Sequence, residues 1–205
     1  MKRFLSLVGL SCLLSGTVSG QNLILNGSFE LPGDSNPATD WQPWSWNAGW
    51  ANTEQAAWGS GSWHIAVGAP GDGGGGYYQI VTASAGISYT LTVDSGADAW
   101  WLPTGTMTMF FLDDSDAELG QATRNTVDPA VYGDNYDIPH PWENYSLSAT
   151  TPAGTAKIKV ELAANNATGS VGFDNAVLVI PEPAAASLAV LGWVVLLGCR
   201  SRCRS

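Results

Sequence analysis

The residues best suited to chemistry in this sequence are its tryptophans, ten in 205 residues, of which all but Trp193 lie between residues 21 and 180. A flat aromatic ring can stack on the apolar C–H face of a sugar, while neighbouring Asp, Asn and Gln side chains bind its hydroxyl groups. Several of these tryptophans lie among Pro, Asn, Gly and Asp residues, a context that favours an exposed loop surface for carbohydrate. The predicted carbohydrate-binding residues are Trp44, Trp46, Trp50, Trp100 and Trp101.

Tryptophan also fills the cores of β-sandwiches, so a purely structural role is the alternative for each ring. Trp63 lies in a segment of alternating polarity and is predicted to be a core residue. The tryptophans alone therefore do not distinguish a binding surface from a filled core.

Side chains for catalysis are few between residues 21 and 180. The two histidines are His64, in a predicted strand, and His140, between two prolines, and no cysteine lies in this region. Without a cysteine or a Gly-x-Ser-x-Gly motif, thiol and serine hydrolase chemistry lack a nucleophile. We therefore expect a protein that is not an enzyme.

Two other motifs have structural explanations. The acidic segment 113–118 could form a metal loop or a carboxylate pair for glycoside hydrolysis. Because it follows an apolar strand and precedes Leu119-Gly120, we predict an acidic hairpin turn instead. The run Gly73–Gly76 lacks the following Lys-Ser/Thr of a phosphate-binding loop and is predicted to be a flexible loop.

The elements that must position these residues are short β-strands. Apolar and polar residues alternate, as at Tyr89, Leu91 and Val93, and clusters of Gly, Pro, Asn and Asp separate the segments. Sustained helical spacing is missing between residues 21 and 180, so we expect an all-β fold, a single antiparallel jelly-roll β-sandwich. The predicted strands are 22–25, 62–67, 77–81, 88–93, 106–112, 142–148, 156–162 and 171–179.

The charge of this region restricts its partners. Residues 21–180 keep three basic residues and seventeen acidic ones, a formal charge of −14. Such a surface repels nucleic acid and anionic lipid and tolerates divalent cations. The three cysteines, Cys12, Cys199 and Cys203, all lie outside this region, which therefore has no disulfide bond.

The N-terminal residues have the pattern of a secretory signal peptide. Lys2 and Arg3 precede the apolar residues 4–14, and Val18-Ser19-Gly20 offers small residues for signal peptidase. We expect residues 1–20 to be removed after Gly20. Cys12 raises the alternative of a lipoprotein, but the residues before it lack the expected leucine and the apolar run continues past it.

The C-terminal residues 181–205 carry a second targeting pattern. Pro181-Glu182-Pro183 precedes the apolar run 184–198, and Arg200, Arg202 and Arg204 follow it. As a helix the apolar run would span about 22 Å, less than the roughly 30 Å of a bilayer core. Such a short segment suits a temporary tether or a processing signal better than a permanent span.

This order of features resembles the PEP-CTERM sorting signal of Gram-negative bacteria. The resemblance implies that a membrane-embedded exosortase cuts near Pro181-Glu182-Pro183 and passes the protein to the outer surface or extracellular matrix. Such proteins commonly accompany exopolysaccharide production, and the C-terminal transmembrane helix contacts the membrane only before processing. A plain C-terminal anchor is the alternative.

The central region is similar to galactose-binding-like jelly rolls, the class that contains many carbohydrate-binding modules. Residues 22–30 (NLILNGSFE) resemble the opening of these domains, and 61–67 resemble their second strand. The central hairpin is matched by 78–91 and the closing strand by 171–178. The resemblance implies one domain over residues 21–180, in which the first and last strands are neighbours.

The resemblance also implies a structural calcium ion. Neighbouring first and last strands would bring Glu30 and Asp174 together, and two such carboxylates repel unless a cation joins them. Many relatives hold calcium there, so Glu30 and Asp174 are the candidate Ca²⁺ ligands. Backbone carbonyl groups, for example at 59–61, would complete the six to eight oxygens that calcium requires. The alternative is that both carboxylates are solvated strand-end or turn residues.

Three functions remain open on the sequence. The first is a non-catalytic, surface-sorted protein that binds extracellular polysaccharide. The second is a structural or adhesive surface protein without a sugar site. The third is a polysaccharide-degrading enzyme on a jelly-roll scaffold, although the shortage of basic residues argues against a lyase, which must neutralise a substrate carboxylate.

Overall fold

The computed structural model describes residues 20–31, 38–55, 63–69, 73–97, 104–127, 140–165 and 169–181, and residues Gln21–Pro181 group into one compact unit. This part of the chain consists of β-strands, turns and irregular segments. Within it, no helix is long and apolar enough to cross a membrane.

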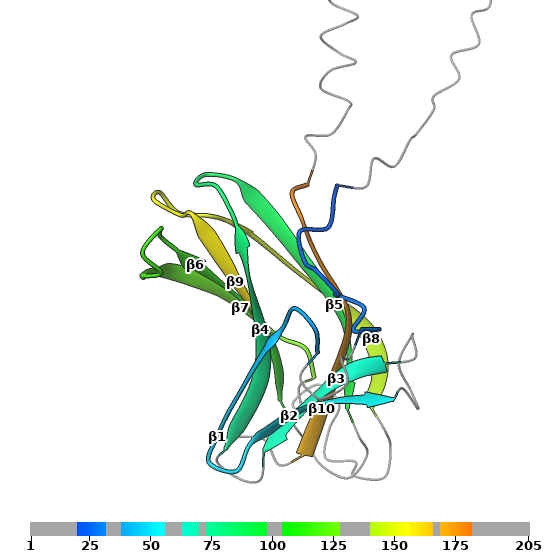
Figure 1. The fold of residues 1–205 in the computed structure, drawn as a ribbon. Helices are drawn as coiled ribbons and strands as arrows, with labels where there is room; N and C mark the ends of the chain where they lie inside the picture. The colour runs from blue at the N-terminus through cyan, green and yellow to red at the C-terminus, as the bar shows by residue number, and fades with distance from the viewer. Residues whose placement is uncertain are drawn as a thin grey trace, which may run out of the picture. The chain divides into compact units, whose positions relative to one another are not determined.

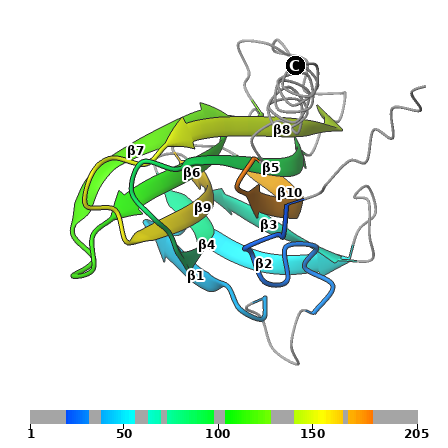
Figure 2. The ribbon, with the colours of Figure 1, turned by 90° about the horizontal axis from the view of Figure 1, so that it is seen from above.

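The strands form two five-stranded sheets with antiparallel pairing throughout (Figures 1 and 2). In spatial order, sheet A contains β1 (Gln42–Trp46), β4 (Gly74–Thr82), β9 (Lys157–Asn165), β6 (Gly105–Leu112) and β7 (Glu118–Asn125). Sheet B contains β2 (Trp50–Gln55), β3 (Trp63–Ala69), β10 (Gly169–Val179), β5 (Ser88–Ala97) and β8 (His140–Thr150). The predicted all-β jelly-roll sandwich is confirmed.

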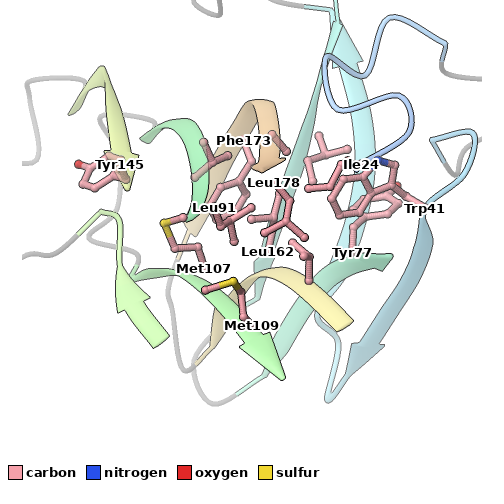
Figure 3. Close-up of a cluster of buried hydrophobic side chains, with 14 of the residues drawn as sticks. Ile24, Trp41, Tyr77, Leu91, Met107, Met109, Tyr145, Leu162, Phe173 and Leu178 are labelled. Atoms are coloured by element: carbon pink, nitrogen blue, oxygen red, sulfur yellow. The ribbon is translucent and has the colours of Figure 1, made fainter. Parts of the chain in front are cut away.

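The core lies between the two sheets and follows from the alternation of side chains along each strand. Leu91 and Val93 of β5 and Val160 and Leu162 of β9 are fully buried, whereas the residues between them face outward. Figure 3 shows Leu91 and Leu162 among the clustered side chains of both sheets. Each such side chain contributes about 1.5–3 kcal/mol by leaving water.

The predicted strand at 22–25 is not a regular strand, although the segment does lie beside the last strand. Leu23 N donates to the carbonyl oxygen of Leu178 at 2.9 Å, and Ala176 N donates to Gly27 O at 2.8 Å. The side chain of Asn22 interrupts regular pairing, because its Oδ1 accepts from the backbone N–H groups of Ile24 and Leu178. The first and last segments of the sandwich are therefore neighbours through mixed backbone and side-chain bonds.

Three strands were not predicted from the sequence, namely β1, β2 and β7. β1 and β2 contain Pro, Asn and Trp residues that resemble a loop in composition. β7 is mostly polar because it is an edge strand of sheet A and most of its residues are exposed.

The prediction of a flexible loop at Gly73–Gly76 is wrong for Gly74, Gly75 and Gly76, which belong to β4 and are buried. The chain passes from β1 in sheet A to β2 in sheet B directly against this run. A Cβ atom at Gly75 would lie 2.2 Å from the carbonyl oxygen of Trp50, so a side chain has no room there. The glycines are needed for this close backbone approach.

The predicted acidic hairpin turn joins β6 to β7. Asp113 Oδ1 accepts hydrogen bonds from the backbone N–H of Ser115, the Ser115 hydroxyl and the backbone N–H of Ala117, at 2.9, 2.7 and 2.9 Å. The bond from the Ser115 side chain is the main reason why the pKa of Asp113 is lowered. Lys157 stabilises the same turn through an ion pair, in which its Nζ lies 2.6 Å from Asp116 Oδ1. The acidic cluster is therefore a turn.

Candidate functional site

The outer face of sheet A, the face directed away from the core, carries a row of aromatic side chains. Tyr77 of β4 points into the core, so Tyr78 points outward and is partly exposed. Phe110 of β6 is likewise partly exposed between the buried residues Met109 and Phe111. Trp44 of β1 completes the row, which therefore crosses the sheet from β1 to β6.

Trp44 packs closely against the backbone of β4, and its Nε1 atom is buried. It is paired with Gly76, and a Cβ atom at Gly76 would lie 2.8 Å from Nε1 and 2.9 Å from Cε2 of the indole. Gly76 is therefore what allows the ring to lie against the sheet. Trp46, two residues further along the same strand, is 47% exposed.

The polar centre of this face is an ion pair between the rings. Lys159 Nζ of β9 lies 4.0 Å from the ring centroid of Phe110 and 5.6 Å from that of Tyr78. The same nitrogen lies 3.2 Å from Glu161 Oε2, and both side chains are mostly shielded from solvent. The aromatic rings thus hold the ammonium group in place, while the carboxylate neutralises its charge.

We call the set Trp44, Tyr78, Phe110, Lys159 and Glu161 the sheet A site. The rings offer apolar faces, the ion pair offers a hydrogen-bond donor and acceptor, and Gln121 lies next to Phe110 in register. Flat aromatic surface combined with fixed polar groups suits a ligand with an apolar face and a rim of hydroxyl groups.

The sequence identified only part of this site. Trp44 and Trp46 lie on the outer face of a strand and not in a loop as expected, while Trp50 lies on β2 in sheet B. Tyr78, Phe110, Lys159 and Glu161 were missed. Side chains alternate between the two faces of a strand, so the outward-facing positions of the predicted strands at 77–81, 106–112 and 156–162 could have identified them.

Other tryptophans have different positions. Trp63 begins β3 and is only partly buried. Among the described residues, the fully buried tryptophan is Trp41, which is 1% exposed and packs against Phe29 at a ring distance of 5.1 Å. Trp41 Nε1 donates to Asn26 O at 3.2 Å. Trp100 and Trp101 lie outside the described residues.

Glu30 and Asp174, the candidate calcium ligands, both lie near the start of β3. Glu30 Oε1 accepts a hydrogen bond from Trp63 N at 3.2 Å, and Asp174 follows Phe173, which is paired with Ile65. Asp174 is fully buried, and its Oδ1 accepts from Asn175 N at 2.7 Å. A buried carboxylate is costly unless its charge is compensated.

The donor set fits a hard cation in type, because calcium prefers carboxylate and carbonyl oxygens. The backbone beside each carboxylate is also unusual, with φ of 54° at Phe29 and 50° at Asn175. Among the described residues, however, no three His, Cys, Asp or Glu side chains are grouped so that they could hold a metal ion. The expected carbonyl ligands at 59–61 lie outside the described residues, so the calcium site stays a prediction.

Two of the predicted processing residues lie at the limits of the described residues. Gly20 is the first described residue and Pro181, which is exposed, is the last. Glu182 and Pro183 lie outside the described residues.

Solved structures with a similar fold include carbohydrate-binding modules. A family 16 carbohydrate-binding module matches with a TM-score of 0.51 and 20% identity, covering 77% of this chain and 99% of that one. The module TmCBM61, solved with β-1,4-galactotriose, matches with a TM-score of 0.50 and 16% identity over 78% of this chain and 99% of that one. At these identities the likeness shows the fold alone.

Part of an enzyme domain has a similar fold as well. The enzymatically active domain of tailspike protein 4 of bacteriophage CBA120 matches with a TM-score of 0.61 and 13% identity over 78% of this chain. The match covers only 21% of that tailspike domain. No protein-family model and no curated protein matches the sequence.

Proposed function

We propose that residues 21–181 bind a polysaccharide chain on the sheet A site and do not cleave it. The observation that carries this proposal is the row of Trp44, Tyr78 and Phe110 across one sheet face, with the Lys159–Glu161 pair between the rings. The carbohydrate-binding modules that share the fold support the same class of ligand.

The bound polysaccharide runs across the strands of sheet A. From β1, which carries Trp44, to β6, which carries Phe110, there are three strand-to-strand steps, a distance of about 14 Å. Several linked sugar rings cover that length. Single stacking contacts are weak and add along a chain, so affinity rises with oligosaccharide length.

The preferred polymer is neutral. Lys159 is already neutralised by Glu161, and the region of residues 21–180 has a formal charge of −14 that repels acidic polymers. Binding therefore depends little on salt concentration.

The two targeting patterns support an exported protein on the outer surface or in the extracellular matrix. There the domain would hold extracellular polysaccharide. Adhesion without a sugar site is the alternative that the following experiment tests.

Affinity electrophoresis of residues 21–181 in gels with neutral polysaccharides (hydroxyethyl cellulose, galactomannan and arabinogalactan) tests the proposal. We expect retardation by at least one polymer, at least tenfold weaker for Trp44→Ala and Phe110→Ala. Leu25→Ala, which removes an exposed apolar side chain from the segment before β1, is the control and keeps full retardation. If no polymer changes the migration of the domain, the protein is instead a structural or adhesive surface protein without a sugar site.

A further inference from the structure

Two further tryptophans, Trp50 and Trp142, pack closely against the opposite side of the sandwich, on the outer face of sheet B. Trp50 of β2 is paired with Gly68 of β3. A Cβ atom at Gly68 would lie 2.8 Å from Cζ2 and 2.9 Å from Cε2 of this indole. The arrangement repeats that of Trp44 on Gly76 in sheet A.

Trp142 reaches the same face from the other edge of sheet B. It belongs to β8 and its indole lies on Gly172 of β10, where a Cβ atom would lie 2.8 Å from Cζ2 and 2.9 Å from Cη2. The intervening strand β5 has Gly96 paired with Gly172, so no side chain stands there. The ring of His64 meets Trp142 edge-on, with 5.5 Å between centroids and 81° between planes.

The two indoles converge on the middle of the sheet. Gly172 is paired with Ala66, and Gly68 lies two residues beyond Ala66 on the same strand. Gly68 and Gly172 are therefore diagonal neighbours, about 7 Å apart in an ordinary sheet. Both tryptophans are partly exposed, and ring atoms of each approach the glycine beneath, while Nε1 of Trp142 is buried.

We propose that Trp50 and Trp142 form a second carbohydrate-binding face, so that one domain holds two polysaccharide chains at once. The class of ligand rests on the proposed function, whereas the location of the site does not. Because sheets A and B are opposite layers of one sandwich, the two chains lie on opposite sides of the domain. The protein is then a cross-link between chains of an extracellular matrix.

Charge and chemistry specify the occupant of this face. The three basic residues of the region, Arg124, Lys157 and Lys159, all belong to strands of sheet A. The guanidinium of Arg124 is held against β8, where it donates to the carbonyl oxygen of Ser146 and lies over the ring of Tyr145. With a formal charge of −14, the region as a whole repels an acidic polymer. Two adjacent flat indoles beside the exposed Asn52 fit a neutral glycan, whose sugar rings stack while its hydroxyl groups meet the amide.

The experiment measures cross-linking and binding separately. Microspheres coated with the neutral polysaccharide that retards the wild-type domain are mixed with monomeric domain, its state checked by gel filtration. We expect the wild type to agglutinate them. Trp50→Ala and Trp142→Ala each lose agglutination but are still retarded in gels. The double variant with Trp44→Ala and Phe110→Ala also loses agglutination and keeps only the weaker retardation that the second face provides. The Leu25→Ala control agglutinates fully.

The outcomes distinguish the two proposals. Agglutination by Trp50→Ala and Trp142→Ala at the wild-type concentration would overturn the second face and leave the sheet A site in place. Loss of all retardation in the double variant with Trp44→Ala and Phe110→Ala would also mean a single site on sheet A.

Full retardation of that double variant, together with loss of retardation in Trp50→Ala, would overturn the sheet A site. If no polymer retards the wild type, both proposals are overturned. If Trp142→Ala does not fold, Trp50→Ala on the edge strand β2 decides the matter.

Discussion

The indole of Trp44 rests directly on Gly76, so close that a single added methyl group at Gly76 would lie 2.8 Å from the indole nitrogen. The position of the ring is thus set by a residue that has no side chain, on a neighbouring strand more than thirty positions away in the sequence. The same relationship holds for Trp50 on Gly68 and Trp142 on Gly172.

Gly76→Ala should weaken polysaccharide binding by displacing Trp44. The added methyl also meets the carbonyl oxygen of Leu162 at 2.8 Å, so some stability is lost as well. Gly86→Ala is the matched control, because φ of 72° there strains any side chain although nothing lies within 4 Å. This control should cost about 1–2 kcal/mol. Retardation in affinity gels should fall for Gly76→Ala and not for Gly86→Ala; equal retardation of both would mean that Trp44 does not contact the glycan.

Trp41→Ala should destabilise the domain by about 3–5 kcal/mol, since it empties a fully buried site. The loss of the hydrogen bond from Trp41 Nε1 to Asn26 O adds to the free-energy cost of the cavity. Trp46→Ala, at a side chain that is 47% exposed, is the matched control and should cost under about 1 kcal/mol. Urea unfolding measures both, and similar midpoints for the two variants would contradict the core assignment.

The domain should lose stability as the pH falls below 6.5, because burial lowers the pKa of His64 from that value. The unfolded chain then binds a proton that the folded state resists, and the penalty grows until the pH reaches the lowered pKa. Glu54 lies opposite His64 in register, and Asp174 lies on the adjacent β10. Their negative charges favour protonation, so burial must outweigh them.

Proton NMR of the two histidines measures this shift directly. We expect one resonance to titrate below 6.5, and His140→Gln should leave that resonance in place. A His64 titration at or above 6.5 would mean that the neighbouring carboxylates prevail over burial.

Chelation should lower the melting temperature if Glu30 and Asp174 hold calcium, since an ion bound only by the folded state stabilises it by mass action. Asp174→Ala should show the same loss and no response to EDTA. Glu118→Gln, an exposed acidic residue of β7, is the control and should respond like the wild type. A melting curve of the wild type that EDTA leaves unchanged would eliminate the site.

The tail should be removed near Pro181-Glu182-Pro183 during export. The apolar run that follows is too short to span a bilayer comfortably, at about 22 Å, and arginines close it. Mass spectrometry of the protein from its native host should find a C-terminus before Ala184. Recovery of the intact Arg204-Ser205 end from the cell surface would rule out this processing.

The sequence by itself determined the fold class and much of the core. Alternation at Tyr89, Leu91 and Val93 is a local property that fixes which face of a strand is apolar, and it predicted the buried face correctly. The acidic turn at 113–118 is equally local, because Asp113 bonds to residues two and four positions away. Local patterns of this kind can be read from a single chain.

Only the tertiary structure decided which tryptophans lie on a surface and in what arrangement. Trp44 and Trp50 look alike in sequence, yet the chain crosses between the sheets after β1, so the two rings lie on opposite faces. How closely an indole on a strand approaches the sheet depends on its cross-strand partner, and the partners Gly76 and Gly68 lie on other strands. The glycine run at 73–76 resembles a loop in sequence, yet Gly76 lies beneath Trp44 in the sheet A site. Pairing between strands that are distant in sequence determines this position.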